Sequence, residues 1–153
     1  MIRLELISSE DIKCAWLQEL KRYAAVADDS QDSLLRSLLK RAALVVQEYA
    51  DTSVLACSFR LYVSGWDIRT VQLYQTVSSV TKVTDENGFE VPYAHSGKLL
   101  TLMRNCKSVI VEYGTVVNEY EFERLSAVVI RYATALYDGQ DKNELDKIIY
   151  EIC

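Results

Sequence analysis

A change in the hydrophobic period along the chain constrains its fold more than any other feature of the sequence. Apolar residues recur at steps of three and four near both ends of the chain, and they alternate every second residue in the middle. The first pattern is typical of amphipathic helices and the second of half-buried strands. We therefore predict a mainly helical α+β fold with about four helices, and with a β-hairpin or small antiparallel sheet inserted between helices 2 and 3. A chain of 153 residues is expected to form a single domain, residues 1–153.

The N-terminal part of the chain predicts a short extended segment and then two helices. Residues 2–6 alternate between apolar and charged side chains, and residues 8–11 form a cap-like sequence for a first helix at residues 9–25. An Asp-rich break follows, in which Asp29 or Ser30 is expected to cap a long second helix. The apolar stripe of this second helix recurs over four turns, which makes it the clearest element of the chain.

The C-terminal part predicts two more helices. The third begins at the polar residue Asn118 and ends at Gly139, since glycine is the usual residue just after a helix. A short fourth helix follows a second cap-like sequence at Asp141. Its apolar stripe is expected to contact either the core of the chain or a partner, and consists of Leu145, Ile148, Ile149 and Ile152.

The middle of the chain predicts strands that are separated by turns. Residues 57–63 alternate in polarity, and residues 109–111 are apolar on both faces, as expected for a central strand. Three polar segments are predicted to turn the chain: residues 65–67, residues 85–88 and residues 104–107. The second contains Asn-Gly, the strongest short-range signal of a hairpin.

The charge pattern argues against a protein that grips nucleic acid. The net charge is −5, whereas proteins that hold phosphates usually carry a basic patch. Arg36, Lys40 and Arg41 do cluster at helical spacing, and we interpret them as a solvated helix face. No run of apolar residues has the length of a membrane span, and residues 1–6 lack the apolar core of a signal peptide, so a complete cytosolic product is expected.

No set of residues in the sequence predicts catalysis, a cofactor or a metal. The only histidine, His95, lies in an expected loop, and it has no second histidine to work with. The cysteines are widely spaced and form no close pair, so a zinc site is not expected. They are predicted to be small buried or half-buried thiols: Cys14, Cys57, Cys106 and Cys153.

The chain is also rich in tyrosine, with ten in total. Tyrosine provides a large amphipathic contact area and is enriched at protein interfaces. Half-buried positions at the edge of a core explain any single tyrosine equally well. Together they favour an interaction protein.

The order of these elements resembles the head–tail connector (adaptor) family of long-tailed bacteriophages. The resemblance spans nearly the whole chain. It is carried by the opening Ser-x-Glu-x-x-Lys segment at residues 8–13 and by the Leu-Leu-x-x-Leu-Leu-x-x-Ala-Ala helix at residues 34–49. It is also carried by the strand and the Asp-x-Asn-Gly turn at residues 76–88, the strand Val-Ile-Val-Glu-Tyr-Gly at residues 109–114, and the helix at residues 118–137.

This resemblance implies a structural virion protein that is not an enzyme. Adaptors form rings of about a dozen copies under the portal protein, and these rings extend the DNA channel and join head to tail. The implied partners are further copies of the chain, the portal, and a tail-side stopper or tail-completion protein. DNA passes through without specific binding, and no membrane is involved. The implied location is the virion, with the host cytoplasm during assembly.

The resemblance also implies where the contacts lie. A lumen-facing helix is expected at residues 118–137, with the candidates Glu121, Arg124 and Arg131. The portal or another partner is expected to contact Leu145, Ile148, Ile149 and Ile152. A hairpin that contacts a neighbouring subunit or ring is expected around Asn87, Gly88 and Phe89.

Two alternatives stay open at this point. The first is a tail-completion or terminator protein, which also forms rings. The second is a small ligand-binding or enzymatic α+β domain, whose mark would be a pocket in which acidic side chains converge.

Overall fold

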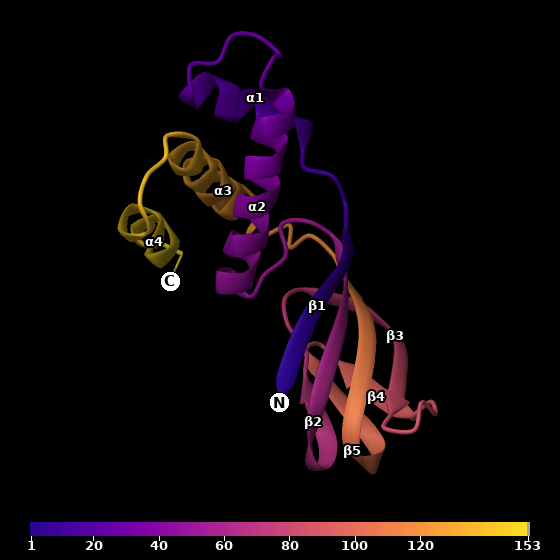
Figure 1. Ribbon diagram of the computed structural model, residues 1–153. Coiled ribbons are helices and arrows are strands. Elements are labelled where there is room, and N and C mark those ends of the chain that lie inside the picture. The colour runs from indigo at the N-terminus through magenta and orange to yellow at the C-terminus, as the bar shows by residue number, and fades with distance from the viewer. Residues whose placement is uncertain (153) are drawn as a thin grey trace. The chain divides into compact units, whose positions relative to one another are not determined.

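The computed structural model describes residues 1–152 and has four helices and a five-stranded antiparallel sheet (Figure 1). The predicted α+β class is therefore confirmed. In the sequence, the strands of the sheet within residues 57–115 follow the second helix and precede the third, as expected. The sheet is larger than a hairpin, because it also includes the N-terminal segment. The elements in chain order are β1 (Ile2–Ser9), α1 (Cys14–Tyr23), α2 (Asp32–Ala50), β2 (Cys57–Gln72), β3 (Val77–Asp85), β4 (Tyr93–Ser96), β5 (Leu99–Thr115), α3 (Phe122–Tyr137) and α4 (Lys142–Tyr150).

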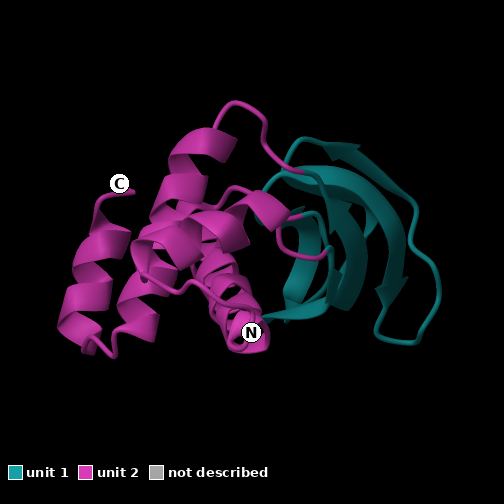
Figure 2. Cartoon of the chain, turned by 90° about the horizontal axis from the view of Figure 1, so that it is seen from above, with its two compact units in different colours: residues 1–10, 56–116 teal, residues 11–55, 117–153 magenta. Residues whose placement is uncertain are grey.

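The chain divides into two compact units, shown in teal and magenta in Figure 2. The sheet unit consists of Met1–Glu10 and Ala56–Val116, and the helical unit of Asp11–Leu55 and Val117–Cys153. Each unit is built from two separate stretches of the sequence. The single domain over residues 1–153 stays a prediction.

The sheet unit is organised around β5. The strand order is β1-β2-β5-β3, and β4 also pairs with β5, so this long strand occupies the centre predicted from residues 109–111. Alternate side chains of β2 and β5 are buried on one face, and they include Phe59, Leu61, Val111 and Tyr113. The Tyr113 hydroxyl accepts a hydrogen bond from the Tyr74 amide at 3.2 Å, which satisfies its polar end within the core.

Two of the three predicted turns are wrong. β2 runs without interruption through residues 65–67, and β5 runs through residues 104–107. The two strands pair with each other on both sides of these segments, with register shifts between Ser64 and Ile68 and between Ile68 and Thr70. Extra residues that are left unpaired in a ladder form a β-bulge, which bends the strand instead of reversing the chain. A short segment that interrupts the alternation of apolar residues suits both a turn and a bulge, so the pattern alone did not distinguish them.

The third predicted turn is confirmed. Gly88 has a φ of +82°, and its amide donates to the Asp85 carbonyl oxygen at 3.1 Å. The buried Asp85 carboxylate accepts the Asn87 and Phe89 amides, each at 2.9 Å, and contacts the Arg104 guanidinium at 2.6 Å. After this turn the bridge from Thr84 to Glu90 continues the predicted hairpin, and the Val91 amide donates to the Val83 carbonyl oxygen at 2.9 Å. The hairpin is short, since β4 pairs with β5 instead.

His95 lies in β4, opposite Leu100, so the expected loop position is wrong. The tight turn of the β4–β5 hairpin is made by the next residues, where Gly97 has a φ of +56°. The histidine ring contacts the Gly97 carbonyl oxygen through Nε2 at 2.7 Å. The histidine is thus an ordinary strand residue beside a hairpin turn.

The turn carboxylate predicts a specific pH dependence. The Arg104 guanidinium, followed by the Phe89 and Asn87 amides, holds the pKa of the Asp85 carboxyl below its ordinary value of 3.8. Protonation therefore favours the unfolded chain, and this stabilisation is present above pH 3.8 and lost as the pH falls through the folded-state pKa.

We expect Asp85→Asn to lower the melting temperature at pH 7 and to flatten its fall between pH 5 and pH 2, roughly the range in which aspartate titrates. Thermal unfolding followed by circular dichroism measures both effects. The exposed residue Asp67 provides the control, and Asp67→Asn should leave the pH profile unchanged. Equal profiles for both variants would contradict the assigned role of Asp85.

The helical unit is built on α2, whose core-facing residues Leu35, Leu39, Ala42 and Val46 are fully buried. The helix ends at Ala50, and the following residue, Asp51, has left-handed backbone geometry. The buried Gln47 side chain accepts hydrogen bonds from the Val54 and Leu55 amides, each at 3.3 Å. These bonds fix the segment that leaves the helix.

Three predicted helix starts are wrong. α1 begins at Cys14, because residues 8 and 9 belong to β1 and the Glu10 carboxylate instead accepts the Ala56 amide at 2.9 Å within the sheet unit. α2 follows Gln31, and neither Asp29 nor Ser30 caps it. α3 begins at Phe122, since the Asn118 side chain accepts the Tyr120 amide and forms a turn before the helix.

The predicted end of α3 and the start of α4 are confirmed. Gly139 has a φ of +70° just after α3, and its amide donates to the Leu136 carbonyl oxygen at 3.1 Å. The Asp141 carboxylate caps α4 by accepting the Glu144 amide at 3.0 Å. None of the helices in the described residues is long and apolar enough to cross a membrane.

Candidate functional site

The predicted contact hairpin lies at an exposed turn of the sheet unit. Asn87 and Gly88 are exposed, and 68% of the Phe89 surface is accessible. The turn is nevertheless held firmly by the Asp85 carboxylate. An exposed aromatic ring on a well-ordered turn is a surface that a partner can cover, and the contact itself stays a prediction.

The three residues of the predicted lumen-facing helix belong to two separate ion pairs. Arg124 contacts the Glu121 carboxylate at 2.7 Å, and Arg131 pairs with Glu151, which follows α4. Arg124 also donates to the Ile152 carbonyl oxygen at 3.3 Å. Pairing with Arg131 lowers the pKa of the Glu151 carboxyl, so both partners stay charged at neutral pH. This face of α3 thus carries nearly neutral pairs, and it holds the end of the chain that follows α4.

The apolar stripe of α4 is divided between two environments. Leu145 and Ile149 are buried in the helical unit, whereas Ile148 and Ile152 are half-buried. The first two side chains belong to the core of the helical unit, one of the two environments expected for the stripe, and contact of the stripe with a partner stays a prediction.

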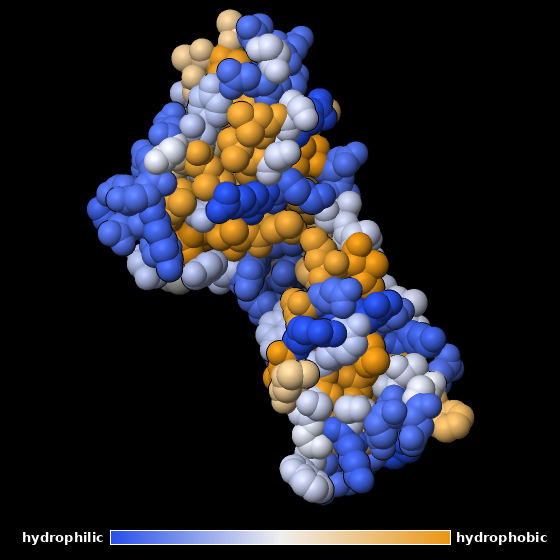
Figure 3. Space-filling view, in the orientation of Figure 1, coloured by the Kyte–Doolittle hydropathy of each residue, from blue (hydrophilic) through white to orange (hydrophobic). Residues whose placement is uncertain are grey.

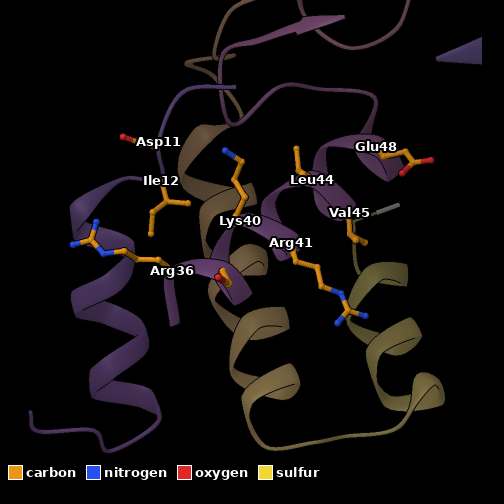
Figure 4. Close-up of a pocket in the computed structure, with 9 residues that line it drawn as sticks. Asp11, Ile12, Arg36, Lys40, Arg41, Leu44, Val45 and Glu48 are labelled. Atoms are coloured by element: carbon orange, nitrogen blue, oxygen red, sulfur yellow. The ribbon is translucent and has the colours of Figure 1, made fainter. Parts of the chain in front are cut away.

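A groove of about 640 Å³ runs along the exposed side of α2 (Figure 4). We call it the α2 groove. Its lining combines apolar side chains, three cations and two carboxylates: Asp11, Ile12, Arg36, Ser37, Lys40, Arg41, Leu44, Val45 and Glu48. The basic cluster that the sequence indicated is thus the lining of a groove with an apolar floor. Sequence reasoning missed the groove because Asp11 and Ile12 come from a different segment.

A second groove lies between α1 and α3. It consists of two adjoining pockets of about 640 and 350 Å³, which share Ala15, Trp16 and Phe122. We call it the α1–α3 groove. The rings of Trp16 and Phe122 stack at 6.0 Å between centroids and form its floor. Its charged lining residues are Lys13, Glu19, Glu119, Glu123 and Arg131.

Both grooves are suited to contacts with a macromolecule. They are open, and each is lined by both apolar and charged side chains. Figure 3 shows a hydrophobic area over α2 that hydrophilic side chains cross. Several tyrosines, including Tyr23 in the α1–α3 groove and Tyr49 on α2, are largely exposed. Such amphipathic rings are enriched where proteins meet.

The described cysteines agree only partly with expectation. Cys57 and Cys106 are buried, as predicted, and burial raises the pKa of the Cys106 thiol. Cys14 is exposed, and Cys153 lies outside the part of the chain that the structure describes. Within that part, no group of three or more His, Cys, Asp or Glu side chains is placed to hold a metal ion.

Comparison with known proteins finds similarity in the fold. No protein-family model matches the chain, and no curated protein matches it. Solved structures that match include chains from gene transfer agent (GTA) particles. A chain from the virion of the native GTA particle has a TM-score of 0.66 and 13% identity, with 97% of this chain and 93% of that chain covered.

Two further matches come from the neck of these particles. A chain in the neck of the empty GTA particle, computed with C6 symmetry, has a TM-score of 0.61 and 14% identity, and 95% of each chain is covered. A chain in the neck of the native particle, computed with C12 symmetry, has a TM-score of 0.56 and 13% identity, with coverage of 95% and 94%. At such identities the likeness shows the fold alone, and at this level the resemblance inferred from the sequence is confirmed.

Proposed function

We propose that this chain is a structural protein of the neck of a phage-like virion, and that within the neck it serves as the head–tail connector (adaptor). The observation that carries the proposal is the fold shared with GTA neck chains over 95% of both chains. Because the match covers nearly all residues of both chains, it favours the view that both are the same kind of neck component. No catalytic step is assigned to the chain.

The proposed assembly is a ring of identical copies. The matching necks were computed with C6 and C12 symmetry, which supports rings built from repeated subunits. We assign the portal to one side of the ring and a stopper or tail-completion protein to the other. The half-buried residues Ile148 and Ile152 remain candidates for such a contact.

We further propose that α3 faces the channel for DNA. The ion pairs of Arg124 with Glu121 and of Arg131 with Glu151 reduce the attraction of this face for phosphates. The net charge of −5 per copy is multiplied in a ring and repels DNA. A lumen of this kind lets DNA slide without being held.

The double variant Glu121→Gln, Glu151→Gln is expected to bind DNA more tightly than the wild type, because it leaves two arginines without their carboxylates. The logarithm of the binding constant should fall more steeply with salt, by a slope of about 0.9 per arginine that reaches a phosphate. Fluorescence anisotropy with labelled duplex DNA over a salt series measures this. The triple variant that adds Arg124→Gln should lose part of the gain, and equal slopes for all three proteins would contradict a lumen-facing α3.

Inactivation of the gene in a strain that produces the particles tests the function itself. Loss of an adaptor should leave heads with portals that carry no tails, and electron microscopy shows this directly. Heads together with free tails of irregular length would instead support the terminator role. Intact, infectious particles without the protein would contradict any structural role in the neck.

A further inference from the structure

The helical unit has two grooves that share no residue and differ in charge. The α2 groove has three cations and two carboxylates, and the α1–α3 groove has three carboxylates and two cations. A ring of identical copies needs two different, complementary patches on each copy, because each subunit contacts its neighbours head to tail. The two grooves meet this requirement.

We propose that the α2 groove of one copy docks onto the α1–α3 groove of the next copy, and that this contact closes the ring. The proposal rests on the ring assembly proposed above, and it identifies the surfaces that form the ring. The occupant of each groove is therefore a second copy of this chain.

Two of the three cations of the α2 groove, Arg36 and Arg41, are available for an intermolecular contact. Arg36 and Arg41 are exposed, and neither forms an ion pair with any of the described residues. The close-up view shows their guanidinium groups extending in opposite directions (Figure 4). Beneath them, Ile12, Leu44 and Val45 are half-buried and provide an apolar floor. A partner that covers this floor would gain apolar burial as well as charge pairing.

The α1–α3 groove offers matching acids. Glu119 and Glu123 are exposed, and within residues 1–152 neither forms an ion pair. Of the other charged lining residues, Arg131 pairs with Glu151 and Glu19 pairs with Arg22. Lys13 lies over the Phe122 ring, so Glu119 and Glu123 are the carboxylates that this groove offers to a partner. The stacked rings of Trp16 and Phe122 lie below them. Acidic side chains above an apolar floor are complementary to the α2 groove.

Helix periodicity places both grooves away from the core-facing positions of their helices. The groove residues of α2 recur at every fourth position, and they alternate with the core positions Leu35, Leu39 and Val46. On α3 the groove residues likewise leave out the fully buried Leu125, Val129 and Ala133. One copy can therefore use both grooves at the same time, once toward each neighbour. A contact that used the same patch twice would close as a dimer instead.

A charge-swap experiment tests the proposal. Arg36→Glu with Arg41→Glu places like charges across the contact, and so does Glu119→Arg with Glu123→Arg. Each double variant is expected to self-associate at least about 10-fold more weakly than the wild type, since like charges at an interface cost several kcal/mol. The chain that carries all four changes should recover most of the loss, because the charges are complementary again. Sedimentation velocity over a concentration series measures the association.

Two controls separate charge effects from folding. Lys107→Glu with Lys142→Glu makes the same change of net charge as the arginine reversal at exposed positions outside both grooves, and it should associate like the wild type. Thermal unfolding of each variant reports whether the chain is folded. If the Arg36→Glu, Arg41→Glu variant unfolds, Arg36→Gln with Arg41→Gln replaces it. This variant is also expected to self-associate more weakly than the wild type, by a smaller factor.

The outcomes distinguish the inference from the function on which it rests. Rings of wild-type protein that both reversals leave intact would overturn the groove contact and leave the proposed function standing. Reversals that spare self-association but abolish incorporation into particles would assign the grooves to another neck protein, and this also overturns the proposal. A wild-type chain that stays monomeric up to about 1 mM would contradict the ring itself, since a Kd of 1 mM corresponds to only about −4 kcal/mol.

Discussion

Replacing Leu39 by alanine is expected to lower the free energy of unfolding by about 2–5 kcal/mol, the range found when a buried leucine is truncated. The side chain is fully buried on the core face of α2, which packs against both α1 and α3. Truncation removes apolar contacts and leaves a cavity that a helix packed on two sides cannot easily close. Urea denaturation followed by circular dichroism measures the loss.

Leu34 on the same helix provides the matched control. About half of its surface is accessible (52%), so Leu34→Ala should change the free energy of unfolding by no more than about 0.5 kcal/mol. Equal effects of the two substitutions would show that α2 does not use the face assigned to the core. The comparison is direct, because the chemical change is identical and the helix propensity at both positions changes in the same way.

Replacing Ile149 by alanine is expected to lower the free energy of unfolding by about 2–5 kcal/mol, with a smaller loss for Ile148→Ala. Only 2% of the Ile149 surface is accessible, whereas Ile148 next to it is half-buried. This result would place α4 in the core of the helical unit. The same denaturation experiment measures both variants.

A larger loss of stability for Ile148→Ala than for Ile149→Ala would contradict the placement of α4 in the core. If Ile149→Ala had little effect on unfolding, the helix would be loosely held and its whole stripe would be available to a partner. If Ile148→Ala left stability intact but reduced binding to a portal protein, the half-buried residue would be the better candidate for that contact. The two readouts together separate a core role from a docking role.

The local sequence pattern was sufficient to predict the elements in which one hydrophobic period or one turn-forming residue dominates. The stripe of α2, the central position of β5 and the Asn-Gly turn were predicted because each depends on neighbours in the sequence. The same holds for Gly139 after α3 and for Asp141 before α4. In each case the structure uses the residue for the physical reason that the sequence indicated.

Tertiary pairing decided the elements that the sequence did not predict. Glu10 resembled part of a helix cap, but its carboxylate accepts the Ala56 amide, which lies 46 positions away. The segments at residues 65–67 and 104–107 resembled turns, but each strand stays paired across them and bulges. Such outcomes depend on partners distant in the sequence, and a local pattern carries no information about them.

The candidate contact surfaces likewise combine features that the local sequence predicts with features that depend on tertiary packing. The spacing of Arg36, Lys40 and Arg41 on one helix was visible in the sequence, whereas the groove also needs Ile12 from a separate segment. The α4 stripe was predicted as one set, yet only packing against α3 separates Leu145 and Ile149 from the other two residues. The ion pair of Arg131 with Glu151 joins residues 20 positions apart, and no spacing rule indicates it.

The central claim is that identical copies of this chain assemble side by side in a phage-like neck. Electron microscopy of the purified chain at high concentration, with class averages along the symmetry axis, tests this most directly. We predict closed rings with an open centre, formed by repeated copies in head-to-tail contact. A population of compact two-fold dimers, with no ring at any concentration, would contradict the account.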